Sequence, residues 1–198
     1  MTQRLFRLLS LSLFAGGLLM VGDGLYIWSK AAFGQILLER SFSRGTQDAA
    51  PVKPWSWADM GALAKIEFPR SGKTSIVLNE SHGEALAWGP GHMPQTPLPG
   101  DAGTSIIAGH RDTHFQFLGM LRMGDEFSVS RFDGHESHFR VISRHIVNAY
   151  YPGLDINNAA SRIALVTCWP LEASRPGGDE RLVLMAERID KPSGQNGG

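Results

Sequence analysis

The 198-residue sequence contains a single cysteine and no excess charge of either sign. One cysteine excludes a disulfide within the chain and any cysteine-rich zinc or iron–sulfur site. Lysine plus arginine equals aspartate plus glutamate at 19 each, and neither sign forms a long run, so the charge pattern of a nucleic-acid-binding protein is missing. We therefore expect no nucleic acid among the partners. Cys168 is either inert packing or part of a chemical site.

The sequence also lacks an internal repeat, a dinucleotide-binding fingerprint and a convincing cluster of oxygen ligands for calcium. His110 and His114 have the H-x3-H spacing of some zinc sites, but Gly109 and an expected strand precede them instead of a helix. His135 and His138 lie in a polar stretch typical of a solvated turn. We therefore expect neither a metal ion nor a cofactor.

The longest apolar run lies near the N-terminus. Arg4 and Arg7 precede it, and it extends from Leu8 to Gly22 and resumes from Leu25 to Trp28, with Asp23 between the two parts. Together they approach the roughly 20 residues that a helix needs to cross about 30 Å of hydrocarbon. Basic residues ahead of such a span favour a cytoplasmic N-terminus. We expect a single-pass anchor in the inner membrane, with the rest of the chain on the periplasmic side.

A cleaved secretory signal is the alternative interpretation of this run, since such signals share the basic start. Ser29-Lys30-Ala31 is a poor cleavage site, which favours a retained anchor. Both interpretations place the folded part of the chain outside the cytoplasm.

Composition divides the chain into four expected parts: an anchor at 1–30, a juxtamembrane helix and linker at 31–60, a folded domain at 61–190 and a polar tail at 191–198. In the second part, apolar residues have helical spacing from Ala31 to Phe42. Ser43 to Pro54 has the small, polar composition of a linker. Ser56 is expected to cap a short helix from Ala58 to Leu63.

After residue 63, short β-rich runs alternate with connections rich in glycine and proline. Strands are expected at Ala64–Phe68, Thr74–Leu78, Ser105–Ala108, Glu126–Val129, Phe139–Ser143, Arg162–Thr167 and Arg181–Ala186. Gly89–His92 and Pro97–Gly100 are expected to be turn-rich connections. This pattern predicts a mainly β fold, either a mostly antiparallel sheet or a closed barrel.

Three polar side chains occur at the ends of expected strands. Cys168 follows the apolar run Ile163–Thr167 and precedes Trp169-Pro170, so its thiol lies where a strand opens into a loop. His110 has the same position after another apolar run, and Arg181 begins the last strand. Taken singly, each residue is more often structural than functional. If the three strands are neighbours, however, the three side chains converge.

Such a trio is chemically sufficient for acyl transfer. A thiolate attacks a peptide carbonyl, an imidazolium protonates the departing amine, and a permanently charged arginine stabilises the developing oxyanion. The sequence therefore predicts a cysteine-dependent acyl-transfer enzyme if the strands are arranged in this way.

Several segments, in order along the chain, resemble the motifs of sortases. They are Gly89-Pro90-Gly91-His92, Pro99-Gly100, Ile107–Phe115, Gly124-Asp125, Val166–Pro170 and Arg181. The N-terminal span, Leu38-Glu39-Arg40, and Pro54-Trp55 with Trp57 are most similar to the proteobacterial class GN sortases. The resemblance covers most of the chain from Ala64 to Arg188 and implies a closed β-barrel of about eight strands with short helices, with 61–190 as the catalytic domain.

The resemblance also implies roles for individual residues. The nucleophile falls on Cys168, the catalytic histidine on His110 and the arginine on Arg181, with Arg175 in the preceding loop as a competitor for the last role. His114 is not the catalytic histidine, because the motif places the imidazole directly after Ala-Gly. The remaining implied contacts, those with substrate, fall on Thr167, Trp169 and His114.

The implied reaction is transpeptidation. The cysteine cleaves an LPxTG-like sorting motif near the C-terminus of a secreted protein through a thioester, and an amine of the cell envelope or of another protein resolves it. Water is expected to compete as a side reaction.

Two other functions stay open at this point. L,D-transpeptidases also pair an external cysteine with histidine, but their Ser-x-Gly-Cys pattern differs from the Val-Thr-Cys-Trp-Pro found here. Papain-like proteases need the opposite order of cysteine and histidine. The non-enzymatic alternative is a membrane-anchored β-barrel adaptor in which Cys168 is packing and the polar strand ends bind a peptide without cleaving it.

Overall fold

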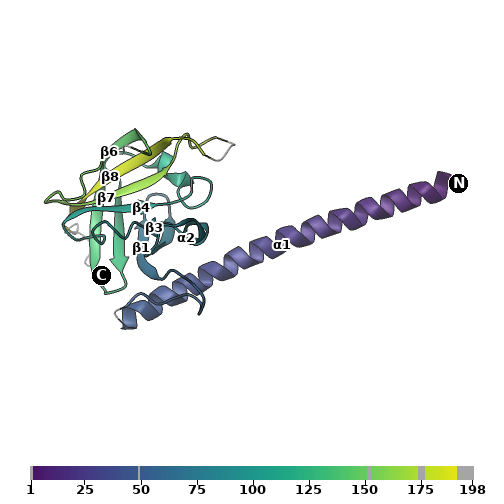
Figure 1. Ribbon diagram of the computed structural model, residues 1–198, viewed down its shortest axis with the longest axis horizontal. Coiled ribbons are helices and arrows are strands. Elements are labelled where there is room, and N and C mark those ends of the chain that lie inside the picture. The colour runs from purple at the N-terminus through teal and green to yellow at the C-terminus, as the bar shows by residue number, and fades with distance from the viewer. Residues whose placement is uncertain (1, 49, 151–152, 174–176, 191–198) are drawn as a thin grey trace, which may run out of the picture. The chain divides into compact units, whose positions relative to one another are not determined.

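A computed structural model describes residues 2–48, 50–150, 153–173 and 177–190 (Figure 1). The expected polar tail at 191–198 lies outside these residues. The chain divides into two compact units, Met1–Ile36 and Leu37–Gly198.

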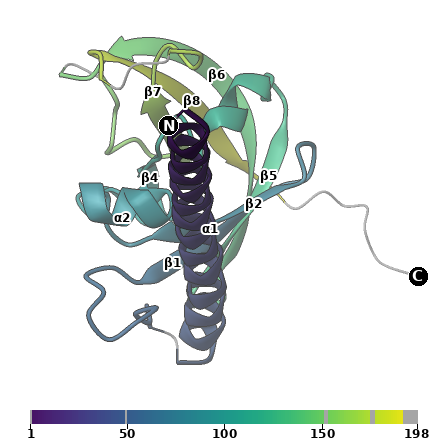
Figure 2. The same ribbon diagram turned by 90° about the vertical axis from the view of Figure 1, so that its right-hand side faces the viewer.

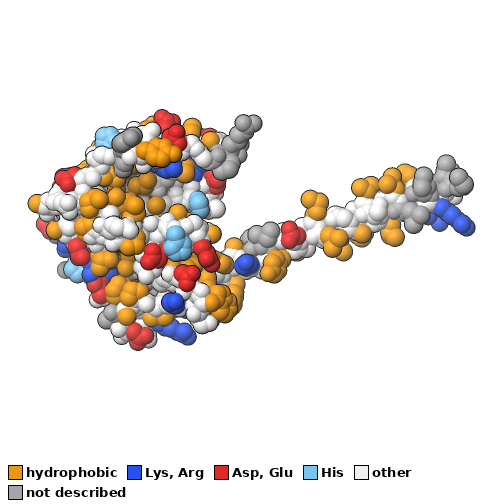
Figure 3. All heavy atoms as spheres, viewed as in Figure 1, with side chains coloured by type: hydrophobic (Ala, Val, Ile, Leu, Met, Phe, Trp, Pro, Cys, Tyr) orange, Lys and Arg blue, Asp and Glu red, His pale blue; other side chains and the backbone are white. Residues whose placement is uncertain are grey.

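The first unit belongs to one long helix, α1 (Thr2–Asp48), which continues into the second unit. Its N-terminal part exposes large apolar side chains such as Leu13 and Leu18. Figure 3 shows hydrophobic side chains along the helix and basic ones at its N-terminal end. Within the described chain, the segment Leu9–Asp48 is the one helical stretch long and apolar enough to cross a membrane. The expected N-terminal apolar helix is confirmed, and its composition suggests a membrane anchor.

The helix runs further than the sequence predicted. A linker was expected from Ser43, but α1 continues to Asp48. The hydroxyl of Ser43 donates to the carbonyl of Glu39 at 3.0 Å, so it bonds within the helix instead of breaking it. Leu38 is fully buried in an apolar cluster with residues such as Met60 and Leu78, and Phe42 packs against this cluster. These tertiary contacts stabilise the C-terminal end of the helix.

The prediction of a short helix after Ser56 is wrong. Residues 50–61 form turns and bends, and Ala62 and Leu63 already belong to the first strand. Ala58 and Met60 are buried on either side of the exposed Asp59, and this two-residue alternation suits an extended chain, in which every second side chain shares a face.

The second unit is a β-barrel (Figure 2). The strands of the described chain are β1 (Ala62–Phe68), β2 (Lys73–Leu78), β3 (Gly91–His92), β4 (Gly103–Ala108), β5 (Glu126–Arg131), β6 (Glu136–Asn148), β7 (Ser161–Cys168) and β8 (Glu180–Ile189). They close in the order β1-β2-β3-β4-β7-β8-β6-β5. The β2–β3 and β4–β7 pairs are parallel and the other pairs are antiparallel.

This arrangement confirms the predicted closed barrel of eight strands, and all seven expected strands are present. The strand β3 was missed, because two residues are too few to show a pattern of alternation. Two short helices lie between strands: α2 (Gly83–Trp88) and the 3-10 helix η1 (Gln116–Met120).

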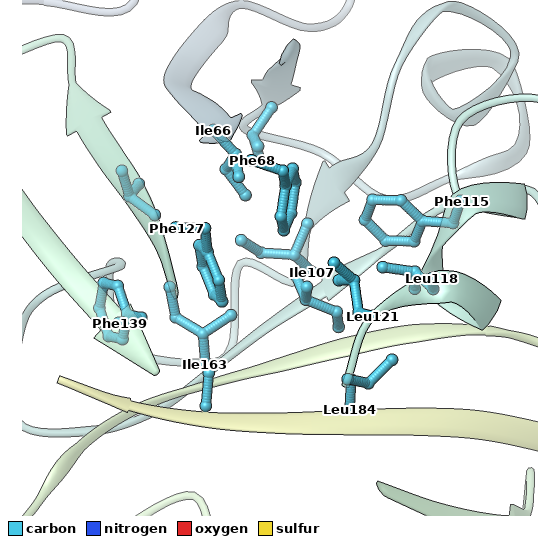
Figure 4. Packing of buried hydrophobic residues seen from close by; sticks show 14 of the residues in the cluster. Ile66, Phe68, Ile107, Phe115, Leu118, Leu121, Phe127, Phe139, Ile163 and Leu184 are labelled. Atoms are coloured by element: carbon cyan, nitrogen blue, oxygen red, sulfur yellow. The ribbon is translucent and has the colours of Figure 1, made fainter. Parts of the chain in front are cut away.

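The barrel interior is packed with aromatic and branched side chains (Figure 4). Phe68 and Phe127 have ring centroids 4.9 Å apart, and Phe127 stacks on Phe139 at 5.6 Å. Each fully buried side chain of this kind contributes about 1.5–3 kcal/mol relative to an exposed one. The interior thus fixes the strands on which any site at the barrel end is built.

A third apolar cluster covers the outer face of β4, β7 and β8. It contains the buried Ile106, Ala164 and Val183, and Leu154 and Ile156 of the β6–β7 connection pack against it. Strand β7 is therefore buried on both faces, which explains why its sequence is an unbroken apolar run instead of an alternating one.

Gly91 tests the packing around β3. A Cβ at Gly91 would lie 2.1 Å from the carbonyl oxygen of Glu80, whereas a Cβ at Gly83 in α2 would meet nothing within 4 Å. Gly91→Ala is expected to lower the free energy of unfolding by about 2 kcal/mol or more, and Gly83→Ala to change it by less than about 1 kcal/mol. Denaturant unfolding of the full chain in detergent measures both, and equal effects would contradict the predicted contact.

Candidate active site

The alternation of β7 places Cys168 on the outer face of the barrel. Ile163 and Leu165 belong to the interior cluster, while Ala164 and Val166 belong to the outer one. Cys168 follows Ala164 and Val166 by two-residue steps, so its side chain faces outward at the last position of the strand. The thiol is only partly buried. The thiol of Cys168 is thus accessible to solvent, unlike the thiol of a core cysteine.

Arg181 lies directly opposite Cys168 on the neighbouring strand. The register of the antiparallel β7–β8 pair joins these two residues. Directly opposed residues of an antiparallel pair have side chains on the same face, with Cβ atoms about 4.5–5.5 Å apart. The guanidinium donates through Nη1 to the carbonyls of Gly178 at 2.7 Å and Glu180 at 2.9 Å, which holds the charge at the start of β8. The competitor Arg175 lies outside the described residues.

His110 reaches the same end of the barrel through the parallel pairing of β4 with β7. This ladder ends with Ala108 opposite Val166. Beyond it, the amide of Gly109 donates to the carbonyl of Val166 at 3.0 Å, and the hydroxyl of Thr167 donates to the carbonyl of Gly109 at 2.8 Å. The exposed His110 follows immediately. Strands β4, β7 and β8 are consecutive in the barrel, so Cys168, Arg181 and His110 stand at the ends of neighbouring strands.

Arg111 connects the two loops that follow β4 and β7. Its guanidinium is almost fully buried, with the residue 4% exposed, and it donates to the Pro170 carbonyl at 2.9 Å and to the Asp112 carboxylate at 2.8 Å. The loop after His110 is therefore tied to the segment after Cys168. Sequence reasoning missed this residue, although a charged residue directly after the histidine was a visible signal.

Thr167 has surroundings that do not suit a contact with substrate, whereas Trp169 is partly exposed. Thr167 is 2% exposed and points into the barrel, where it bonds the Gly109 carbonyl as described. Trp169 is partly buried against the interior cluster, its amide donates to the Glu180 carbonyl at 3.0 Å, and the guanidinium carbon of Arg144 lies 5.9 Å from its ring centroid.

His114 lies in the loop after His110 and is half-buried. Burial lowers the pKa of His114, a hydrogen bond to the Ala87 backbone opposes that change, and the charge of His110 lowers it further. Its Nε2 is buried and has no hydrogen-bond partner among the described residues. Within that same part of the chain, no group of three or more histidine, cysteine or acidic side chains could hold a metal ion.

Comparison with known proteins agrees with this architecture. Residues 66–189, more than half of the chain, match the sortase domain family, and the chain therefore belongs to the sortase family. Sortase D of Bacillus subtilis (strain 168) is 24% identical over 153 residues, which cover 76% of each chain.

Solved sortase structures have the same fold. Sortase A from Corynebacterium diphtheriae matches with a TM-score of 0.62 and 23% identity, covering 70% of this chain and 66% of that one. The Clostridium perfringens sortase D5 transpeptidase matches with a TM-score of 0.64 and 19% identity, covering 80% and 99%. Sortase C-1 from Actinomyces oris matches with a TM-score of 0.57 and 26% identity, covering 65% and 74%.

By its family, the protein is a sortase transpeptidase, which favours this function over the L,D-transpeptidase and adaptor alternatives. The finer resemblance to class GN sortases stays a prediction.

Substitution of Thr167 tests whether its hydrogen bond to Gly109 fixes the loop that carries His110. Thr167→Val keeps the side-chain shape but leaves the buried Gly109 carbonyl without its donor, which is expected to cost about 1–3 kcal/mol of unfolding free energy. Turnover should also fall, because Gly109 precedes His110. Thr74→Val, the same change at an exposed position, should alter the unfolding free energy by less than about 0.5 kcal/mol. Thermal unfolding and peptide cleavage would measure the two effects.

Arg111 is expected to be needed for turnover beyond its effect on folding. Arg111→Lys keeps the charge but cannot reproduce the paired bonds to Pro170 and Asp112, because an ammonium lacks the planar fork of a guanidinium. Motif cleavage should fall about tenfold or more at a temperature where circular dichroism shows the variant folded. Arg140→Lys, at an exposed position on β6, is the matched control. Equal activity of the two variants would contradict a positioning role.

Proposed function

We propose that this sortase uses Cys168 as nucleophile, His110 as general acid and base, and Arg181 to stabilise the oxyanion. The observation that carries the proposal is the register of three adjacent strands. Cys168 is paired with Arg181 across β7 and β8, and the hydrogen bonds of Gly109 with β7 bring His110 to the same strand ends.

In the first half-reaction, the thiolate of Cys168 attacks the backbone carbonyl of the sorting motif. The carbonyl oxygen becomes an oxyanion, which the permanent charge of Arg181 stabilises. The hydrogen bonds of Arg181 to the carbonyls of Gly178 and Glu180 both use Nη1, so we assign the oxyanion to Nε or Nη2. The imidazolium of His110 protonates the departing amine, and a thioester to Cys168 remains.

In the second half-reaction, an amine attacks the thioester carbon, the C–S bond breaks, and Cys168 leaves as a thiolate. The amine proton passes to His110, which is now a neutral imidazole and acts as base. The thiolate–imidazolium pair is thereby restored. Water can replace the amine, which gives hydrolysis as a side reaction.

Sortases act on secreted proteins that carry sorting signals. For this chain we propose an LPxTG-like motif near the C-terminus of the substrate and an amine acceptor from the cell envelope or from another protein. The apolar part of α1 supports a single-pass anchor at residues 1–30 in the inner membrane. Arg4 and Arg7 ahead of it favour a catalytic domain at 61–190 on the periplasmic side.

The surroundings of the other expected residues support distinct roles. Thr167 is buried against the Gly109 carbonyl, so we propose that it positions the histidine loop instead of touching substrate. Trp169 and His114 flank the strand ends and stay our candidates for substrate contact.

The reaction class can be tested on the full chain in detergent. The protein is incubated with candidate motif peptides, with and without an amine, and analysed by mass spectrometry. We expect an acyl adduct on Cys168 in the absence of amine and a ligated product in its presence. A thiol-selective reagent should modify Cys168 in the folded protein, because the side chain is only partly buried. Ligation that persists in Cys168→Ala would overturn the mechanism.

Substitutions of the three proposed catalytic residues should separate chemistry from folding. Cys168→Ala and His110→Ala are expected to reduce turnover by about a thousandfold or more with unchanged circular dichroism. Arg181→Lys should lose about a hundredfold, because a point charge on a flexible stem cannot replace an aligned guanidinium. His135→Ala, at an exposed turn, is the control for His110 and should retain full activity. Unfolding of Cys168→Ala would instead favour a packing role for the cysteine.

A further inference from the structure

A cavity of about 590 Å³ lies between the β1–β2 turn, η1 and β6. Its lining consists of Arg70 and Ser71 of the turn, residues 119–122 of η1 and the segment after it, and Arg144 of β6. The volume falls within the range of small-ligand sites, about 300–1,000 Å³. Three of the seven lining residues are arginines, and none of these described residues is acidic. The cavity therefore suits an anion.

The positive charge of the three arginines is only partly balanced. Arg70 pairs with Asp125, whose Oδ1 accepts from Nη1 at 2.6 Å, and the same carboxylate lies within reach of the charge of Arg122. Within the part of the chain that the structure describes, neither Arg122 nor Arg144 forms a salt bridge. Three positive charges around one carboxylate leave an excess of two, so the cavity favours a doubly charged anion.

Asp125 also fixes the segments that carry the arginines. Its second oxygen, Oδ2, accepts from the amide of Arg122 at 2.8 Å, so one carboxylate joins the β1–β2 turn to the turn before β5. That second turn is bonded to β6, because the amide of Val141 donates to the Asp125 carbonyl at 2.9 Å. Arg144 follows on β6 and donates to the Gly119 carbonyl at 3.4 Å. The protein itself thus holds the three segments together, which lowers the entropy cost of binding a ligand.

Guanidinium groups match a phosphate group in both charge and shape. Each presents a planar fork of donors that bonds two oxygens of one phosphate. A phosphate monoester carries about −1.5 to −2 charge at pH 7, which balances the excess in the cavity, whereas a carboxylate carries only a single charge. The three arginines are exposed, so a ligand can reach them from solvent. Met120 and Leu121 add apolar lining that suits the organic part of an ester.

The cavity borders the segment that follows Cys168. The guanidinium carbon of Arg144 lies 5.9 Å from the ring centroid of Trp169. A Cβ at Gly119 would lie 2.6 Å from Cδ1 of Leu171, so Leu171 packs closely over Gly119. Two lining residues of the cavity therefore contact the loop after β7, and a bound anion would share Arg144 with the ring of Trp169.

We propose that this cavity binds a phosphate monoester, with Arg122 and Arg144 as its main contacts and Arg70 as a third. The inference is independent of the proposed chemistry at Cys168, and it gives the protein a second binding site beside the loop after β7. A soluble ester and a lipid headgroup present the same phosphate group, so both are sources of this ligand chemistry.

Isothermal titration of the full chain in detergent with phenyl phosphate measures this binding, at constant ionic strength because salt screens exposed charges. Arg122→Gln and Arg144→Gln are each expected to raise Kd about tenfold, as the loss of one charge-assisted contact predicts. Benzoate, a monocarboxylate of similar shape, should bind about tenfold more weakly than phenyl phosphate. Arg162→Gln, near the opposite end of β7 from Cys168, is the control and should keep Kd within about twofold.

Tryptophan fluorescence tests where the ligand binds. Inorganic phosphate should change the emission of the chain, because the anion draws on the guanidinium that lies over the ring of Trp169. The change should be absent in Trp169→Phe, although titration should show that this variant still binds phenyl phosphate. A fluorescence change that persists in Trp169→Phe would contradict binding at Arg144.

The two sources of the phosphate are separated by competition. Phosphatidic acid in nanodiscs that weakens phenyl phosphate binding would identify a lipid headgroup, and absence of competition would identify a soluble ester; both results support the site. Absence of saturable binding to the unaltered chain would overturn the proposal. Equal Kd values for Arg122→Gln, Arg144→Gln and Arg162→Gln would overturn it as well, because binding would then not depend on the cavity.

Discussion

The parallel pairing of β4 with β7 is the constraint on which the site depends. Parallel neighbours end at the same edge of a sheet, so the residues that follow Ala108 and Val166 leave the barrel together. Two hydrogen bonds of Gly109, one to Val166 and one from Thr167, extend the contact past the last ladder pair. The antiparallel β8 then begins where β7 ends, which adds Arg181 to the same edge.

The rigidity of this edge comes from burial on both faces of β7. Its inward side chains pack in the barrel interior, and its outward side chains lie beneath the β6–β7 connection. The connection is itself fixed to β4, because the Thr104 hydroxyl donates to the Asp155 carbonyl at 2.7 Å. A nucleophile at the end of such a strand is held more firmly than one on a loop.

The loops around the edge are held by polar contacts instead. The buried guanidinium of Arg111 is costly to remove from water, and its bonds to Pro170 and Asp112 offset that cost. These bonds connect the loop after His110 with the loop after Cys168. The position of His110, the proposed catalytic histidine, therefore depends on a neighbouring charge as well as on its strand.

The sequence alone determined most of the local structure. Apolar runs bounded by glycine and proline predicted seven of the strands, and the strand-end positions of Cys168, His110 and Arg181 pointed to the candidate site. Local sequence patterns gave wrong or missing elements where contacts between distant segments determine the secondary structure. The helix α1 passes Ser43 with its C-terminal part packed in the second unit, Ala62 and Leu63 join β1, and β3 exists only through its pairing with β2 and β4.

Only the tertiary structure decided which strands are neighbours, that Thr167 points inward, and that Arg111 bonds a carbonyl 59 residues away. The physical reason is that register and pairing are set by contacts between segments far apart in the chain. A sequence pattern records which residues prefer burial, and it does not record against which partner they are buried.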